Sequence, residues 1–159
     1  MGWTRRRTKD LGRVAAALSC LLSIVLGAAA LSLALASDSG SSVRLIVHPS
    51  NTVASFERAF LADAFLKKAT RWPDGEAIEP VDQRYGTPVR DRFSEHVLRR
   101  SAAAIRSYWQ QRIFTGRGVP PPELDSDAAV LRYVQTHRGG VGYVSESAAI
   151  SAVNVIAIH

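Results

Sequence analysis

The sequence predicts one domain of the α/β class, with a small mixed sheet flanked by helices, behind an apolar leader. Short runs of β-branched residues alternate with longer segments whose apolar residues recur every three to four positions. Residues 37–159 number 123, which is enough for one ordinary domain. We therefore expect a single compact lobe over residues 43–159.

The first 36 residues have the layout of a secretory signal peptide. Basic residues precede an apolar stretch at 14–36, which ends in a small-x-small cleavage site, Ala-Leu-Ala, before Ser37. The alternative is an uncleaved membrane anchor, because these 23 residues are long enough to span a bilayer. In both cases the arginines stay inside, so we expect the domain outside the cytoplasm, in a periplasmic or equivalent compartment, behind a polar linker at 37–42.

Charge and cysteine content exclude several classes of function. The chain carries 20 Lys+Arg against 14 Asp+Glu, but five of the former and one of the latter precede residue 37, which leaves 15 against 13. This balance lacks the dense basic face of a nucleic-acid-binding domain. Cys20 in the leader is the only cysteine, so the exported part has no disulfide, thiolate zinc site or thiol nucleophile. The four histidines show no metal spacing and no Gly-x-Ser-x-Gly elbow occurs, so we expect no enzyme and no cofactor.

The first half of the domain is expected to form a strand, a helix and a second strand. Residues 43–47, VRLIV, are short and rich in β-branched residues, which is typical of a strand. After a turn, the apolar residues of 55–68 recur on one helical face, with Ser55 as the N-cap. A Pro-Asp-Gly turn then leads to a short strand at 77–81.

The second half is expected to contain three helices and two strands, at 88–99, 101–114, 126–137, 141–144 and 153–158. Pro88 suits the first position of its helix, where a missing N–H has no consequence, and Thr87 then falls at the N-cap. Ser126 is the N-cap of the last helix. The stretch TGRGVPPP at 115–122 is expected to be an exposed loop, because its glycines and prolines do not continue a helix.

The junction VDQRYGTPVRDRF contains the main candidate for a binding site. N–H groups at a helix start have no internal partner, and the helix dipole adds positive potential there, so an anion finds donors already aimed at it. Gly86 permits a close approach of the backbone and Thr87 adds a hydroxyl. Arg84 and Arg90 bracket the turn and can supply charge-assisted hydrogen bonds. The alternative interpretation is a capped helix with surface arginines nearby.

Four segments occur in an order that resembles the phosphate-binding protein family of ABC transporters, which has the type 2 periplasmic binding fold. They are IVHPSNTVASFERAFLADAFLKKATRWPDGEAIEPVDQ, YGTPVRDRF, FTGRG and GGVGYV, and they cover nearly all of residues 43–159. The chain looks most like small, exported single-domain members. The resemblance implies one lobe of that fold, holding phosphate or a similar oxyanion for an ABC transporter or a sensor in the membrane.

The resemblance also implies which residues bind the anion. The family's loop reads roughly Arg-Ser-Asp-x-Ser-Gly-Thr, and Gly86 and Thr87 match its end. Tyr85 stands where a Ser is expected, and Arg84 matches the family's Arg only after a shift of register. The expected ligand-binding residues are Arg84, Tyr85, Gly86 and Thr87, with Ser50 and Asn51 from the first loop. Because one lobe leaves a site open to water, the alternative is a ligand-free envelope scaffold, sensor or accessory protein with the same fold.

Overall fold

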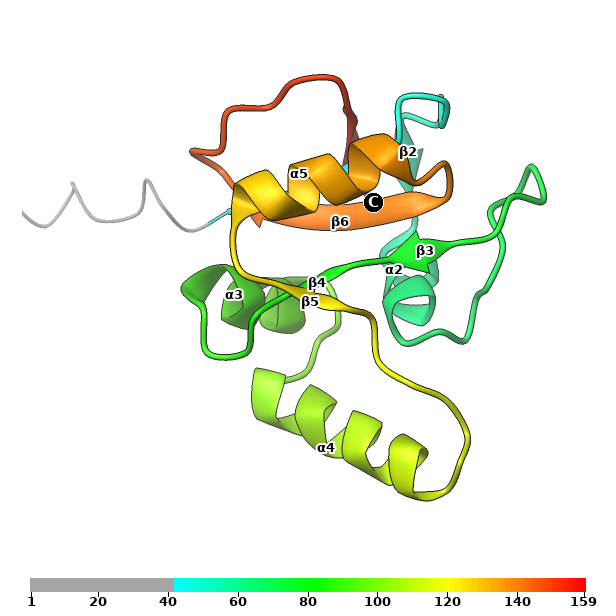
Figure 1. Cartoon of the computed structure of the whole chain (residues 1–159), viewed down its shortest axis with the longest axis vertical. Helices are drawn as coiled ribbons and strands as arrows, with labels where there is room; N and C mark the ends of the chain where they lie inside the picture. The colour runs from blue at the N-terminus through cyan, green and yellow to red at the C-terminus, as the bar shows by residue number, and fades with distance from the viewer. Residues whose placement is uncertain (1–41) are drawn as a thin grey trace, which may run out of the picture. The chain divides into compact units, whose positions relative to one another are not determined.

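A computed structural model describes residues 42–159, which form two sheets and the helices around them (Figure 1). The expected leader at 1–36 lies outside the described residues. Among the residues that are described, no helix is long and apolar enough to cross a membrane. The helices are α2 (Arg58–Phe65), α3 (Pro88–His96), α4 (Ala102–Phe114) and α5 (Asp127–Thr136). The strands are β1 (Val43–Val47), β2 (Ser55–Phe56), β3 (Glu79–Pro80), β4 (Asp82–Gln83), β5 (Glu123–Leu124), β6 (Gly140–Ser145) and β7 (Asn154–Ile158).

The larger sheet is mixed and has the strand order β2-β7-β1-β6-β3. Its centre is antiparallel, with β1 pairing with both β6 and β7, whereas the short outer strands β2 and β3 run parallel to their neighbours. A second sheet consists only of β4 and β5, paired in parallel. The predicted fold class, a small mixed sheet flanked by helices, is confirmed.

Helices cover both faces of the larger sheet. Because successive side chains of a strand point to opposite faces, each face of the sheet has its own hydrophobic core. In β1, Leu45 and Val47 belong to the core under α2, α3 and α4, whereas Ile46 belongs to the core under α5. The helix α5 lies directly over β6 (Figure 1). A Cβ at Gly142 of β6 would come within 2.6 Å of Cγ1 of Val130 on α5, so this close packing requires glycine.

Two expectations about the first helix are wrong. The segment 55–68 does not begin as a helix, because Ser55 and Phe56 form β2 and pair with Ala157 and Ile158 of β7. The N-cap of α2 is Glu57, without a side-chain cap. Strand pairing with a segment about a hundred residues away overrides the local helix signal here.

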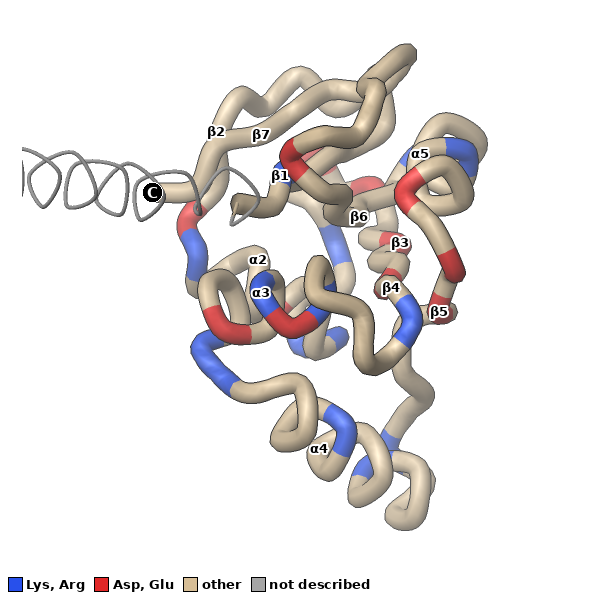
Figure 2. The backbone as a smooth tube through the Cα atoms, turned by 90° about the vertical axis from the view of Figure 1, so that its left-hand side faces the viewer, with Lys and Arg blue, Asp and Glu red and all other residues tan. Residues whose placement is uncertain are grey.

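The predicted strand at 77–81 is also revised, and this revision bears on the site. The structure has two short strands in this region instead of one. The strand β3 comes before Val81 and belongs to the larger sheet, and β4 comes after Val81 and belongs to the smaller sheet. The chain therefore leaves the larger sheet along β4, forms α3 and α4, and returns along β5, where Asp82 lies opposite Glu123. Acidic and basic positions gather where β4 and β5 run side by side (Figure 2).

Candidate functional site

The turn at residues 84–87 joins β4 to α3. The carbonyl of Arg84 accepts hydrogen bonds from the Thr87 N–H at 3.3 Å and from the Thr87 hydroxyl at 3.0 Å. Gly86 is the third residue of this turn and has a φ of +84°, the conformation that a type II turn demands there. A Cβ on Gly86 would meet nothing within 4 Å, so the space above the turn is open.

Thr87 caps α3, as the sequence predicts. Its hydroxyl oxygen accepts a hydrogen bond from the Arg90 N–H at 3.4 Å, and its carbonyl accepts one from the Asp91 N–H at 3.1 Å. Pro88 occupies the first turn of the helix, where no N–H is needed. The Thr87 hydroxyl is thus engaged as both donor and acceptor, and it reaches a ligand only by giving up its bond to the Arg84 carbonyl.

Arg84 lies on the surface in an ion pair with Asp125. The Nη2 atom of Arg84 is 2.6 Å from Oδ1 of Asp125, and the two side chains are 63% and 69% exposed. The Arg84 N–H is fixed separately, by a 2.9 Å bond to the carbonyl of Leu124. Because so exposed a pair contributes little stability, an anion in solution can compete with Asp125 for the guanidinium.

The sequence predicts Arg90 at the surface beside the turn. In the structure Arg90 lies beneath the turn, with only 3% of its surface exposed. Its Nη2 is 2.9 Å from Oδ2 of Asp82, and its Nη1 donates to the Gln83 carbonyl and to Oε1 of Glu123, both at 2.6 Å. The Tyr143 hydroxyl donates to Oδ1 of Asp82 from the opposite side. These contacts tie α3 to β4, β5 and β6, so the network positions the turn above it.

Burial governs the protonation of this network. Burial raises the pKa of the Asp82 carboxyl, and the attraction of Arg90 opposes that rise without cancelling it. Burial also raises the pKa of the Tyr143 phenol, and the neighbouring Asp82 raises it further. For Arg90, burial acts to lower the pKa, but the carboxylates of Asp82 and Glu123 outweigh burial and raise it, so the guanidinium stays charged.

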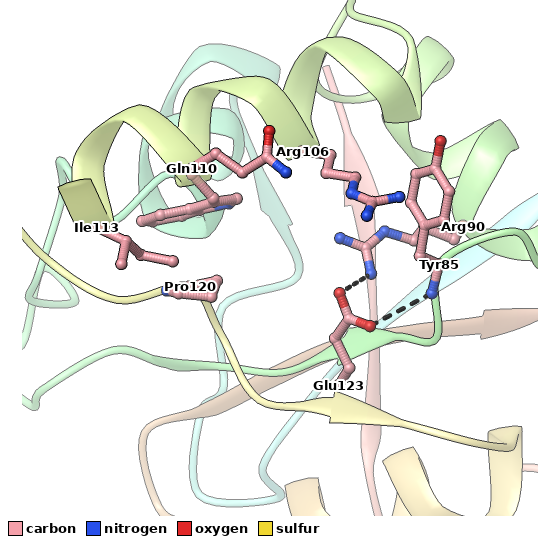
Figure 3. Close-up of a pocket in the computed structure, with 8 residues that line it drawn as sticks. Tyr85, Arg90, Arg106, Gln110, Ile113, Pro120 and Glu123 are labelled. Carbon is pink, nitrogen blue, oxygen red and sulfur yellow. Dashed lines mark hydrogen bonds and ion pairs between the residues drawn. The ribbon is translucent and has the colours of Figure 1, made fainter.

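An open cavity of about 340 Å³ lies beside the turn (Figure 3). The helix α4 provides one wall, and the loop before β5, β5 itself and the turn provide the others. The lining residues are Tyr85, Arg90, Arg106, Trp109, Gln110, Ile113, Pro120 and Glu123. Tyr85 is held at the mouth, since its N–H lies 3.4 Å from Oε2 of Glu123 and the Arg106 guanidinium lies 5.0 Å from its ring centroid. Sequence reasoning missed Arg106 and Glu123 because both are far along the chain from the turn.

Ser50 and Asn51 lie at the other end of β6 from the turn. Next to them, the His48 N–H donates to the carbonyl of Gly140, the first residue of β6, at 3.2 Å. Gln83, just before the turn, instead donates from its side chain to the Tyr143 carbonyl near the far end of that strand, at 3.1 Å. The structure therefore brings Arg84, Tyr85, Gly86 and Thr87 together in one turn but does not bring Ser50 and Asn51 to them.

Ser50 and Asn51 take part in local contacts. Ser50 Oγ is 2.7 Å from Nδ1 of His48, and Oδ1 of Asn51 accepts a hydrogen bond from the Val53 N–H at 3.1 Å. The Asn51 carbonyl accepts another from the side chain of Asn154 at 2.7 Å. These bonds stabilise the loop that leads from β1 to β2.

Solved structures with the same fold include two whose names refer to phosphate transport. One, assigned as a phosphate ABC transporter substrate-binding protein of Clostridium perfringens and solved with bound phosphate, has a TM-score of 0.59 and 21% identity over 75% of this chain. An ABC-type phosphate transport receptor from Vibrio cholerae has a TM-score of 0.54 at 14% identity, and PstS from Borrelia burgdorferi has 0.56 at 10%, each over 75% of this chain.

These similarities define the class of fold. The chain has the fold of periplasmic binding proteins, at the size of a single lobe. It spans 45%, 46% and 47% of the length of these three structures, so it corresponds to less than half of each. No protein-family model matches the chain, and no curated protein matches it either.

Proposed function

We propose that this chain is an exported solute-binding-like protein that takes phosphate or a similar oxyanion at the turn formed by Arg84, Tyr85, Gly86 and Thr87, for an ABC transport system. The observation that carries the proposal is the combination, in a fold that phosphate-named proteins share, of an open turn at the start of α3 with an exposed guanidinium at its edge. The helix dipole adds positive potential at this point. The Arg84 guanidinium supplies the donors, because the N–H groups of Thr87 and Arg90 already bond within the turn and Pro88 has none.

Arg84 is the principal anion contact in this proposal. An oxyanion takes the place of Asp125 on the Arg84 guanidinium, exchanging one charge-assisted hydrogen bond for another. Affinity is expected to be modest, since the site stays in contact with water and its charges are screened. Ser50 and Asn51 lie at the opposite end of β6, so this mode of binding does not use them.

The test is calorimetric titration of the purified full-length chain with phosphate, sulfate and a neutral polyol. Saturable heat with a Kd on the order of 1 mM, equivalent to about 4 kcal/mol, is expected for the anions and not for the polyol. Arg84→Gln should weaken it severalfold. The matched control is Arg132→Gln, at an exposed arginine of α5, which should leave it unchanged. Thr87→Ala is a poorer probe, because it also removes the cap of α3.

The alternative function is that of a ligand-free envelope scaffold, sensor or transporter accessory. Two observations favour it. The Thr87 hydroxyl and the Arg84 guanidinium both have partners within the chain, and the chain spans less than half the length of the phosphate-named structures. Absence of phosphate heat at about tenfold above the expected Kd, or equal heat in wild type and Arg84→Gln, would contradict oxyanion binding at the turn and leave this alternative.

A further inference from the structure

The cavity between α4 and β5 has an apolar end and a charged end. Figure 3 shows Ile113 and Pro120 at one end, with the Arg90 and Arg106 guanidinium groups, Tyr85 and Glu123 gathered at the other. A volume of about 340 Å³ lies at the small end of the range for pockets that hold small organic ligands. A ligand that matches this cavity therefore has an apolar body and a polar head.

Two residues of the lining are large hydrophobic side chains left uncovered. Ile113 is 53% exposed and Tyr85 is 40% exposed, although the sequence places Ile113 on the apolar face of its helix. Trp109, which lines the same cavity, is otherwise buried in the core. Covering this apolar surface is favourable at about 25 cal/mol per Å². The cavity thus offers a hydrophobic gain to a ligand of the right size.

One guanidinium at the polar end is not engaged by a carboxylate of the described residues. Arg90 pairs with both Asp82 and Glu123, and Glu123 in turn is held by Arg90 and the Tyr85 N–H. Within the described residues Arg106 has no ion pair, and its guanidinium lies 5.0 Å from the Tyr85 ring centroid. A guanidinium held over an aromatic ring keeps its donors available for a planar carboxylate. Of the two guanidinium groups that line the cavity, Arg106 is therefore the one whose donors can reach a ligand carboxylate.

We propose that this cavity binds a small aromatic or arylalkyl carboxylate, with its carboxylate on Arg106 and its ring against Trp109, Ile113 and Pro120. The site adjoins the turn at which inorganic phosphate is proposed to bind, and Tyr85 lies beside both, but its cation is Arg106 of α4 and not Arg84. An organic acid gains binding free energy at both ends of the cavity, whereas inorganic phosphate gains it only at the charged end.

The experiment titrates the full-length chain with 3-phenylpropionate, followed by the heat of binding and by tryptophan fluorescence, since Trp109 lines the cavity. Saturable binding is expected, and the neutral 3-phenylpropan-1-ol should bind about tenfold more weakly because it forms no charge-assisted hydrogen bond. Arg106→Gln should weaken 3-phenylpropionate by a similar factor and Ile113→Ser by severalfold. Arg132→Gln, the matched surface control, should have no effect.

Four results would overturn the proposal, and the fourth concerns Arg84→Gln. The first three are no saturable signal up to roughly 10 mM ligand, equivalent to a Kd weaker than about 1 mM, equal affinities for the acid and the alcohol, and equal affinities in wild type and Arg106→Gln. All the variants change exposed residues, and a thermal melt of each confirms folding. Arg84→Gln separates this site from the turn, because it should weaken phosphate but not 3-phenylpropionate. If it weakens both equally, the two anions share one site and the second site does not exist.

Discussion

Two of the arginine–carboxylate pairs, Arg90–Asp82 and Arg84–Asp125, lie on either side of the same turn. Their distances are similar, but their exposure to solvent differs. Arg90 and Asp82 are 2.9 Å apart and almost completely buried, whereas Arg84 and Asp125 are 2.6 Å apart and mostly exposed. The guanidinium of the buried pair is held by both Asp82 and Glu123, and the pair serves to hold α3 against β4. The exposed pair can exchange its carboxylate for a ligand. Burial, and not distance, therefore separates a structural ion pair from a candidate recognition site.

Arg90→Met tests the buried pair and should have the largest effect. It leaves Asp82 and Glu123 without their cation, and breaking a buried pair from one side costs about 3–5 kcal/mol of the free energy of unfolding. Urea unfolding at pH 7 measures it. Arg84→Gln is the control, and its expected change lies within about 0.5 kcal/mol. Equal losses in the two variants would mean that burial does not distinguish these pairs.

Tyr143→Phe tests a second contact of the buried Asp82, the hydrogen bond from the Tyr143 hydroxyl. The phenylalanine keeps the stacking on Phe93, whose ring centroid lies 3.8 Å away, but removes the hydroxyl that donates to Asp82 and accepts from the Gln83 N–H. Asp82 keeps its ion pair with Arg90, and the Gln83 N–H keeps its 2.9 Å bond to Oδ1 of Asp82. Loss of the hydrogen bond from the hydroxyl to the charged Asp82 should cost about 1.5–3 kcal/mol. The same urea titration measures it, and a neutral result would show that water replaces the hydroxyl.

Alkaline pH should destabilise the wild type more than Tyr143→Phe. Burial raises the pKa of the Tyr143 phenol above its ordinary 10.0, so above pH 10 the unfolded chain releases this proton while the folded chain retains it. The free energy of unfolding then falls with rising pH, by at most about 1.4 kcal/mol per pH unit from this group. Unfolding between pH 9 and pH 11 should show a steeper decline in the wild type, and parallel curves would contradict it.

Asp125→Asn tests the exposed pair and should change stability least, by no more than about 0.5 kcal/mol. Its informative effect is on binding. Removing the carboxylate frees the Arg84 guanidinium, so phosphate affinity should rise about two- to threefold if the turn is the oxyanion site. Calorimetry with phosphate measures the change. A decrease would show that Asp125 belongs to the binding machinery and does not compete with the ligand.

Local signals predicted much of this fold. Thr87 and Ser126, which the sequence indicates as N-caps, each cap the helix that follows through a side-chain oxygen. An N-cap is set by a residue and the three after it, so a linear sequence contains the whole signal. Ser55 shows the limit, because its position is decided by pairing with Ala157, which no local pattern reports.

The candidate site was predicted less completely than the fold, for a related reason. The turn around Gly86 is visible in the sequence because glycine there satisfies a local backbone requirement. The burial of Arg90 depends on Glu123 and Tyr143, which reach it only through the pairing of β4 with β5 and the position of β6. The role of Arg106 likewise depends on how α4 packs. Charged residues that come together only through tertiary structure have no characteristic spacing in the sequence.

The parallel pair β4 and β5 also has a consequence for insertions into the chain. The chain leaves the larger sheet after Asp82 and comes back at Glu123, and these two residues lie opposite each other. A connecting segment needs only to bring its two ends to these paired residues. Its length matters little, because the entropy cost of closing a loop grows only slowly with length. The exposed loop between α4 and β5 can thus be lengthened at little cost in stability. The helices themselves cannot be exchanged in the same way, because Phe93 of α3 and Trp109 of α4 belong to the core that covers the larger sheet.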